Sequence, residues 1–126
     1  MIWRVRLEDL SGLSTLVREI LPDRSTAVPL DCLLDPSYFA IMSEEAFLLA
    51  RLDMWNGQRV VFILSAGARK SVSQYIRNEM NAWLEHWARE QGASRILAFT
   101  RTPEVFLKRH GYQLESFVIS RAVPTS

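Results

Sequence analysis

The sequence predicts an α/β fold with a mixed, mostly antiparallel sheet and one parallel βαβ crossover. Three observations carry this prediction. Residues 69–92 show the pattern of a long amphipathic helix, and runs of strand character stand on either side of it at 59–65 and 94–100. An Asn-Gly pair at 56–57 marks a tight hairpin. We expect residues 1–126 to form a single domain, with 120–126 as a partly frayed tail.

The helix expected over Arg69–Gly92 gives the strongest periodic signal. Its apolar residues recur at steps of three and four. They are Val72, Tyr75, Ile76, Met80, Trp83, Leu84, Trp87 and Ala88. Gly92 supplies the left-handed residue that often ends a helix. Because a strand precedes and follows this helix, the two strands should be parallel neighbours with the helix packed across them.

The N-terminal part of the chain reads as strand, helix and loop. Apolar residues alternate with arginines over Ile2–Leu7, which predicts a strand. One face of Glu8–Leu21 is apolar at helical spacing, and Pro22 ends this helix. Residues 23–28 are polar and read as a loop, whereas 29–34 fit either a helical turn or an extended segment.

Two hairpins are expected in the middle of the chain. Asp35-Pro36 favours a turn, after which Ser37–Met42 and Ala46–Met54 read as strands joined by the acidic turn 43–45. The Asn-Gly pair tolerates positive φ at both turn positions, which a type I′ hairpin requires. Strands near 46–54 and 58–65 should therefore pair antiparallel.

The C-terminal part reads as strand, short helix and strand. Ser94–Thr100 is the strand that follows the long helix. Pro103 opens a short helix, because a proline at the first helical position loses no hydrogen bond, and Gly111 ends it. Tyr112–Val123 alternates and is expected to be one final strand.

Composition excludes several classes of protein. The chain is 48% hydrophobic and 23% charged, enough for a core, and its net charge of +1 argues against strong nucleic-acid binding. The single cysteine, Cys32, excludes a disulfide framework and is expected to be a small buried side chain. No apolar run reaches the ~20 residues that cross a bilayer, so we expect a cytoplasmic protein without membrane contact. His86 and His110 lack metal-ligand neighbours, so no metal site is expected.

The order of elements resembles the GCN5-related N-acetyltransferase (GNAT) family. The stretches that carry the resemblance are AlaArgGluGlnGlyAlaSerArgIle at 88–96 and ValPheLeuLysArgHisGlyTyr at 105–112. In that family a strand leads into a loop and a helix N-terminus that hold the pyrophosphate of acetyl-coenzyme A. Unpaired N–H groups and the helix dipole make such a terminus a site for anions.

The resemblance breaks down at the residues that carry the family's chemistry. The phosphate motif, Gln or Arg with a Gly and a Gly or Ala, falls on 72–77, where Tyr75 and Arg77 replace the small residues and Val72 the polar one. Leu107 occupies the position of the family's acid, and leucine cannot transfer a proton. The strand before the helix has no glutamate to act as a base. We therefore expect a non-catalytic structural or interaction module, similar to the acetyltransferase-like virion or assembly proteins of short-tailed phages.

Two alternatives remain open: an acetyl-coenzyme A-dependent N-acetyltransferase with an atypical pyrophosphate loop, and a regulatory module that binds a phosphorylated ligand. No catalytic residue and no cofactor is expected under the first interpretation. If acetyl-coenzyme A binds, the residues expected to hold it are Ser65, Arg69, Lys70, Ser73, Gln74 and Arg77. Otherwise the basic cluster of Arg69, Lys70 and Arg77 is a solvated surface.

The partners expected from the sequence are proteins, including a symmetric viral assembly. The candidate contacts are Trp55, Arg69 and Lys70. Trp55 precedes the hairpin turn, where it is either an exposed anchor for a partner or packed over a neighbouring strand.

Overall fold

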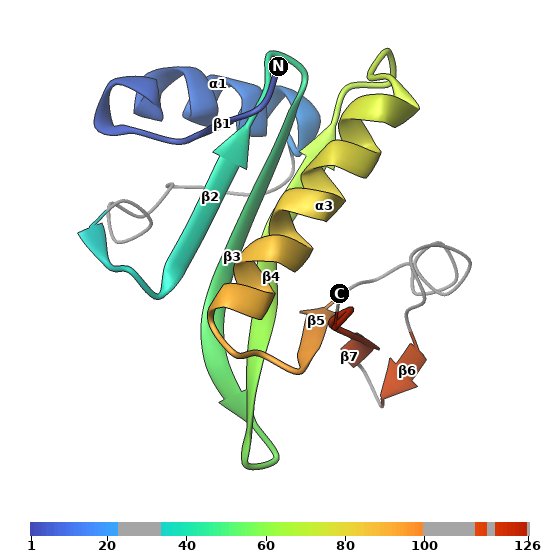
Figure 1. The fold of residues 1–126 in the computed structure, drawn as a ribbon. Helices are drawn as coiled ribbons and strands as arrows, with labels where there is room; N and C mark the ends of the chain where they lie inside the picture. Colours follow the sequence, from blue (N-terminus) through green and yellow to red (C-terminus); the bar gives the residue numbers. More distant parts are fainter. Residues whose placement is uncertain (23–33, 100–112, 116–117, 126) are drawn as a thin grey trace.

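The computed structural model describes residues 1–22, 34–99, 113–115 and 118–125. The elements, in order, are β1 (Trp3–Arg4), a 3-10 helix η1 (Leu7–Asp9), α1 (Leu10–Ile20), β2 (Tyr38–Met42), β3 (Ala46–Trp55), β4 (Gln58–Ala68), α3 (Gln74–Glu90), β5 (Arg95–Phe99), β6 (Gln113–Glu115) and β7 (Val118–Ala122). The strands form one sheet in the order β1-β2-β3-β4-β5-β7-β6. Only the β4–β5 pair is parallel. The predicted fold class is confirmed (Figure 1).

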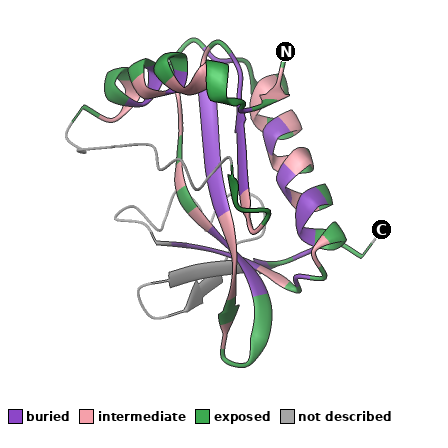
Figure 2. Cartoon of the chain, turned by 90° about the vertical axis from the view of Figure 1, so that its left-hand side faces the viewer, coloured by how far each residue is buried: buried purple, intermediate pink, exposed green. Residues whose placement is uncertain are grey.

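The α-helices among the described residues, α1 and α3, cover opposite faces of the sheet (Figure 2). Along each strand alternate side chains point to opposite faces. Those on one face pack against Met80, Leu84, Trp87 and Ala88 of α3. Those on the other face pack against Leu13, Leu16 and Val17 of α1. The helical apolar patterns read from the sequence therefore mark the buried faces, except at Tyr75, which was expected on the apolar face of α3 but is exposed.

The predicted turns on both sides of β3 are confirmed. Ser43 N–H donates to the Ala46 carbonyl at 2.9 Å, which closes the turn between β2 and β3. Asn56 and Gly57 have φ of 51° and 76°, and Trp55 pairs with Gln58 across them. Both turn residues thus adopt the left-handed conformation that the Asn-Gly pair favours.

The long helix is shorter at its start than expected. It begins at Gln74, not at Arg69, because Ser73 is extended and its side chain accepts the Ile76 N–H at 3.3 Å. Residues 69–73 are a loop instead of a first helical turn. The C-terminal end agrees with the prediction, since Gly92 has φ of 71°.

The first strand is also shorter than expected. The strand predicted over Ile2–Leu7 covers only Trp3–Arg4, and the 3-10 helix η1 begins at Leu7. The Asp9 carboxylate accepts the Arg6 N–H at 2.9 Å, and this local bond turns the chain away from the sheet.

The single strand expected over Tyr112–Val123 was wrong as well. Its described residues form two strands, β6 and β7, which pair antiparallel with Glu115 opposite Val118. No glycine or proline interrupts the alternation here, so the pattern gave no sign of a hairpin.

Several predictions lie outside the described residues. They are the loop at 23–28, all but the last residue of the segment 29–34, Cys32, and the short helix from Pro103 to Gly111 with its Leu107 and His110. Within the described part of the chain, no helix is both long and apolar enough to cross a bilayer.

Candidate functional site

The second half of β4 leaves the sheet open on one side. β4 pairs with β5 from Val60 to Ile63, opposite Arg95 to Ala98. Beyond Ile63 it continues to Ala68, where β3 is its sole partner among the strands that the structure describes. Leu64 is an extra residue at this point, because Ala50 lies opposite Ile63 and Leu49 lies opposite Ser65. Such a β-bulge bends its strand and is common beside active sites.

The direction of the free backbone groups follows from the pairing. Arg69 donates its N–H to the Glu45 carbonyl at 2.8 Å, on the β3 side. Backbone groups alternate sides along a strand, so Gly67 and Ser65 also face β3. Ala66 and Ala68 then present their N–H and C=O groups to the open side, where no described residue pairs with them.

The N-terminus of α3 lies directly after this open strand. The first N–H groups of a helix lack partners inside the helix. Ser73 caps the N–H of Ile76, whereas the N–H groups of Gln74 and Tyr75 have no partner among the described residues. Together with the helix dipole, these groups favour an anion at this end.

The loop between β4 and α3 is fixed to the rest of the protein by Arg69 and Ser71. The Arg69 guanidinium forms an ion pair with Glu19 of α1 at 2.5 Å. Ser71 Oγ donates to a carboxylate oxygen of Glu45 at 3.3 Å. Val72 is buried beneath the loop. The loop is therefore held in place without any ligand.

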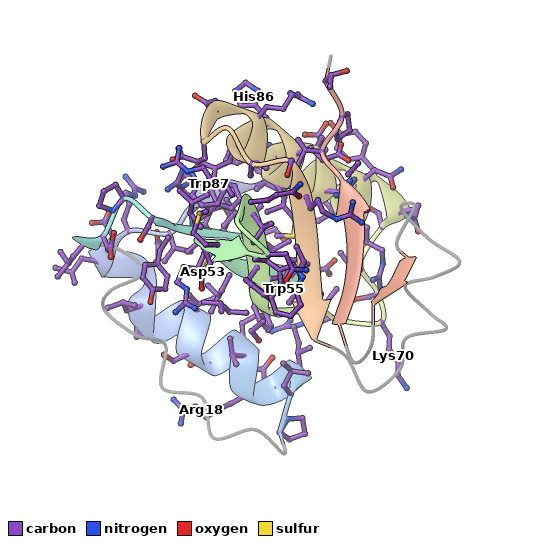
Figure 3. All side chains as sticks on the ribbon, turned by 90° about the horizontal axis from the view of Figure 1, so that it is seen from below. Arg18, Asp53, Trp55, Lys70, His86 and Trp87 are labelled. Atoms are coloured by element: carbon purple, nitrogen blue, oxygen red, sulfur yellow. The ribbon has the colours of Figure 1, made fainter. Side chains whose placement is uncertain are left out.

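Five of the six predicted coenzyme-binding residues gather at this end of α3. Of them, Arg69 is engaged with Glu19, and the Gln74 amide donates to Asn78 at 3.0 Å. Lys70 is exposed, forms no ion pair within the described residues, and projects away from the body of the molecule (Figure 3). Arg77 is half-buried and Ser73 is the cap.

Ser65, the sixth predicted residue, lies on the open half of β4, one residue after the bulge. Its Oγ is buried and has no hydrogen-bond partner among the described residues. Tyr75, expected to obstruct phosphate, has a side chain that is 69% exposed to solvent.

The open strand edge is what the sequence interpretation missed. A usable signal was the run of small residues from Ser65 to Ala68. Within it, a Cβ on Gly67 would come within 2.7 Å of the Ile20 Cγ2 atom of α1. Small residues late in a strand often mark a close approach of another chain or ligand.

Trp55 is packed over a neighbouring strand. Its ring meets Phe62 edge-on, with ring centroids 5.8 Å apart, near Val60 and Leu97. The structure places it at the base of the hairpin turn (Figure 3). Its role as an anchor for a partner protein stays a prediction.

A polar cluster lies on β2 and β3, away from the open edge of β4. Arg51 and Asp53 form an ion pair at 2.7 Å. A hydrogen bond from the Met54 N–H and, to a smaller extent, one from Arg51 lower the pKa of Asp53. Hydrogen bonds with Tyr38 and, to a smaller extent, with Asp53 raise the pKa of Arg51. A carboxylate with a lowered pKa is a weak base, so this cluster is a poor source of proton transfer. No group of three metal-ligating side chains occurs in the described ranges.

Comparison with known proteins finds matches among solved structures. No family model matches the sequence, and no curated protein matches it significantly. The aminoglycoside 6'-N-acetyltransferase from Enterococcus faecium gives a TM-score of 0.75 at 13% identity, over 100% of this chain and 98% of its own. A GNAT-family acetyltransferase from Staphylococcus aureus Mu50 gives 0.75 at 12% identity, over 98% of this chain and 99% of its own. This chain has the GNAT fold.

A third structure with the GNAT fold holds coenzyme A. It is N-acetylglutamate synthase from Neisseria gonorrhoeae, complexed with coenzyme A and N-acetyl-glutamate, with a TM-score of 0.73 at 16% identity. The match covers 98% of this chain and 35% of that one, so this chain spans about a third of the synthase.

These comparisons correct the function expected from the sequence. A non-catalytic virion or assembly module was wrong, because the structures that share the fold are acetyltransferases, one of them with coenzyme A bound. They give no support to a resemblance to phage proteins. Tyr75 and Arg77 replace small residues at the helix start, but the backbone of β4 is a second place where a ligand can bind.

Proposed function

We propose that this protein is an acyl-coenzyme A-dependent N-acyltransferase. One observation carries the proposal: the unpaired edge of β4 at Ala66 and Ala68 leads directly to the uncovered N–H groups at the start of α3. The two features suit the two ends of an acyl-coenzyme A. Its pantetheine arm carries amide groups, and its nucleotide end carries a pyrophosphate.

The open strand edge is assigned to the pantetheine arm and the thioester. An extended chain with amides can pair with a free strand edge through backbone hydrogen bonds. The N–H groups of Ala66 and Ala68 are then the available donors for carbonyl oxygens of the arm. Placed near the thioester, such a donor also stabilises the negative charge that develops on its oxygen.

The start of α3 is assigned to the pyrophosphate. The Gln74 and Tyr75 N–H groups are available, and Lys70 adds a free cation. Arg69 is assigned a positioning role, because its pairing with Glu19 fixes the loop. Because the Tyr75 side chain is mostly in solvent, it leaves room for an anion at the backbone.

The reaction joins an amine nitrogen to the acyl carbon and breaks the carbon–sulfur bond. The amine loses a proton and the coenzyme leaves as a thiolate that takes one up. β4 carries no acidic side chain and Leu107 cannot donate, so water is assigned to both proton transfers. Two neighbours are named for N-acetylation of unrelated compounds, so the amine acceptor is not carried over from them.

Calorimetric titration with acetyl-coenzyme A tests the proposal. We expect binding tighter than roughly 100 μM, about −5.5 kcal/mol, and release of free thiol when a panel of primary amines is added. No heat at millimolar concentration would contradict the proposal.

A matched pair of variants tests the role of the strand edge. Ala66→Pro removes the N–H on the open side but leaves the β3 ladder intact, because Ala66 does not face β3. Ala66→Ser keeps that N–H and a similar size. Donor binding should be weakened at least tenfold in Ala66→Pro and unchanged in Ala66→Ser. Equal binding by both folded variants would show that the strand edge is not the site.

A second pair of variants tests where the nucleotide end of the coenzyme binds. Tyr75→Gly and Arg77→Gly restore the small residues of the family motif. If their side chains hinder phosphate, acetyl-coenzyme A should bind more tightly to these variants, whereas pantetheine alone should bind unchanged. Unchanged coenzyme affinity would show that neither side chain obstructs the pyrophosphate.

A further inference from the structure

A cavity lies at the other end of α3, away from the proposed donor site. It has a volume of about 430 Å³ and runs between the C-terminal half of α3 and the sheet edge formed by β1 and β2. It is lined by Arg4, Phe39, Trp83, His86, Trp87 and Glu90. That volume falls in the range of small-molecule sites, ~300–1000 Å³.

The floor of this groove is aromatic and fixed. The rings of Phe39 and Trp87 are stacked with centroids 5.0 Å apart and an angle of 18° between their planes. Both side chains are almost fully buried, so their positions are set by the core. Trp83, one turn earlier in α3, is partly buried beside them. Trp83 is therefore the aromatic ring that a ligand in the groove would meet, with the buried Phe39 and Trp87 rings fixed beneath it.

The walls of the groove carry one cation that lacks an ion-pair partner. The Arg4 guanidinium lies over the Phe39 ring, 4.7 Å from its centroid. Partial burial lowers the pKa of Arg4, and the Glu90 carboxylate offsets this only in part. No carboxylate of the described residues comes within ion-pair distance of Arg4.

The groove is also lined by one carboxylate, that of Glu90, which contacts a side chain of its own helix. Glu90 lies 3.2 Å from the His86 Nε2 atom, one turn away on α3. Figure 3 shows His86 at the outer side of this helix and Trp87 turned toward the sheet. The groove therefore combines an apolar floor with an unpaired cation.

We propose that this groove binds a small monocarboxylate with an apolar, preferably aromatic, body. The body lies against the partly exposed Trp83 ring, and the carboxylate pairs with the Arg4 guanidinium. Guanidinium and carboxylate match in geometry and form strong charge-assisted hydrogen bonds. The site is separate from β4 and from the start of α3, so such a ligand does not compete with an acyl donor.

A titration followed by NMR of the tryptophan indole N–H groups tests this, with no acyl donor present. The probe is 3-phenylpropionate, and 3-phenyl-1-propanol is the neutral control of similar shape. We expect the carboxylate to move the signals of Trp83 and Trp87 but not those of Trp3 and Trp55. Equal affinity for the alcohol, or shifts confined to Trp3 and Trp55, would overturn the proposal.

Matched variants test whether the carboxylate of the ligand binds to Arg4. Arg4→Gln should weaken binding of 3-phenylpropionate at least tenfold and leave the alcohol unaffected. Arg6→Gln is the control, because Arg6 is exposed and pairs with Glu8 outside the groove. Glu90→Gln, a change on the exposed helix surface, should tighten carboxylate binding by removing a like charge. Unchanged affinity in both Arg4→Gln and Glu90→Gln would overturn the assignment.

Discussion

The two halves of β4 differ in their neighbouring strands and in their burial. From Val60 to Ile63 the strand lies between β3 and β5, and Val60 and Val61 are fully buried. From Leu64 to Ala68 it pairs with β3 on one side and with no other described residue, and Leu64 is 40% exposed. The halves are divided by one extra residue. A single strand can therefore supply both the core of the sheet and an open site, without a separate loop for the site.

Hydrogen exchange of backbone amides should show the largest contrast between the halves. The Val61 amide lies between two paired strands and should open only with global unfolding, about 5 kcal/mol or more. The Ala66 and Ala68 amides should exchange about a thousand-fold faster or more. Acetyl-coenzyme A should selectively slow the exchange of these two amides. Similar protection of Val61 and Ala66 in the free protein would mean that the edge of β4 is covered.

Truncation in the first half should cost the most stability. Phe62 packs against Trp55 and Leu97, so Phe62→Ala leaves a cavity and should lower the free energy of unfolding by about 3–5 kcal/mol. Chemical denaturation measures this. Leu64→Ala, at the exposed bulge, is the control and should cost less than about 1 kcal/mol. A comparable loss in both variants would erase the distinction between the halves.

Adding a side chain in the second half of β4 should have an intermediate effect on stability. The Cβ of Gly67→Ala would lie 2.7 Å from the Ile20 Cγ2 atom, which should cost about 1–3 kcal/mol of stability. Ile20→Ala removes the clashing group. The double variant should be more stable than the sum of the two single losses predicts. If it is not, the close contact with α1 does not cause the loss of stability in Gly67→Ala.

Changes at the helix cap should have the smallest effect on stability. Ser73→Ala removes the hydrogen bond to the Ile76 N–H and should cost about 1 kcal/mol. Ser73→Asp keeps a cap and suits the helix dipole, so its thermal stability should match the wild type. The same carboxylate should nevertheless weaken acetyl-coenzyme A binding by repelling the pyrophosphate. Undiminished affinity in Ser73→Asp would place the pyrophosphate elsewhere.

The sequence predicted the features whose cause is local. The hairpin at Asn56 and Gly57 and the helix end at Gly92 depend on conformations that few residues adopt, so they could be read directly. The buried faces of both helices follow from apolar spacing. The start of α3 was placed too early because Arg69 and Val72 extend the helical pattern, whereas the Ser73 cap decides the boundary.

The candidate site could be predicted only in part, because its main features depend on long-range pairing. The ion pair between Arg69 and Glu19 joins residues 50 positions apart, so it leaves no pattern in the sequence. The bulge at Leu64 depends on which residue of β3 lies opposite, and alternation along β4 alone does not reveal it. The basic residues at the helix start were found because they are adjacent in the chain.

The extra residue at Leu64 makes the sheet less stable locally than an unbroken ladder would be. Ile63 and Ser65 already lie opposite Ala50 and Leu49, so deleting Leu64 would make them successive residues of a regular ladder. A straightened β4 could then stay beside its parallel neighbour for longer. A protein selected for thermostability alone would be expected to lose this residue, and with it the open strand edge proposed to bind the acyl donor.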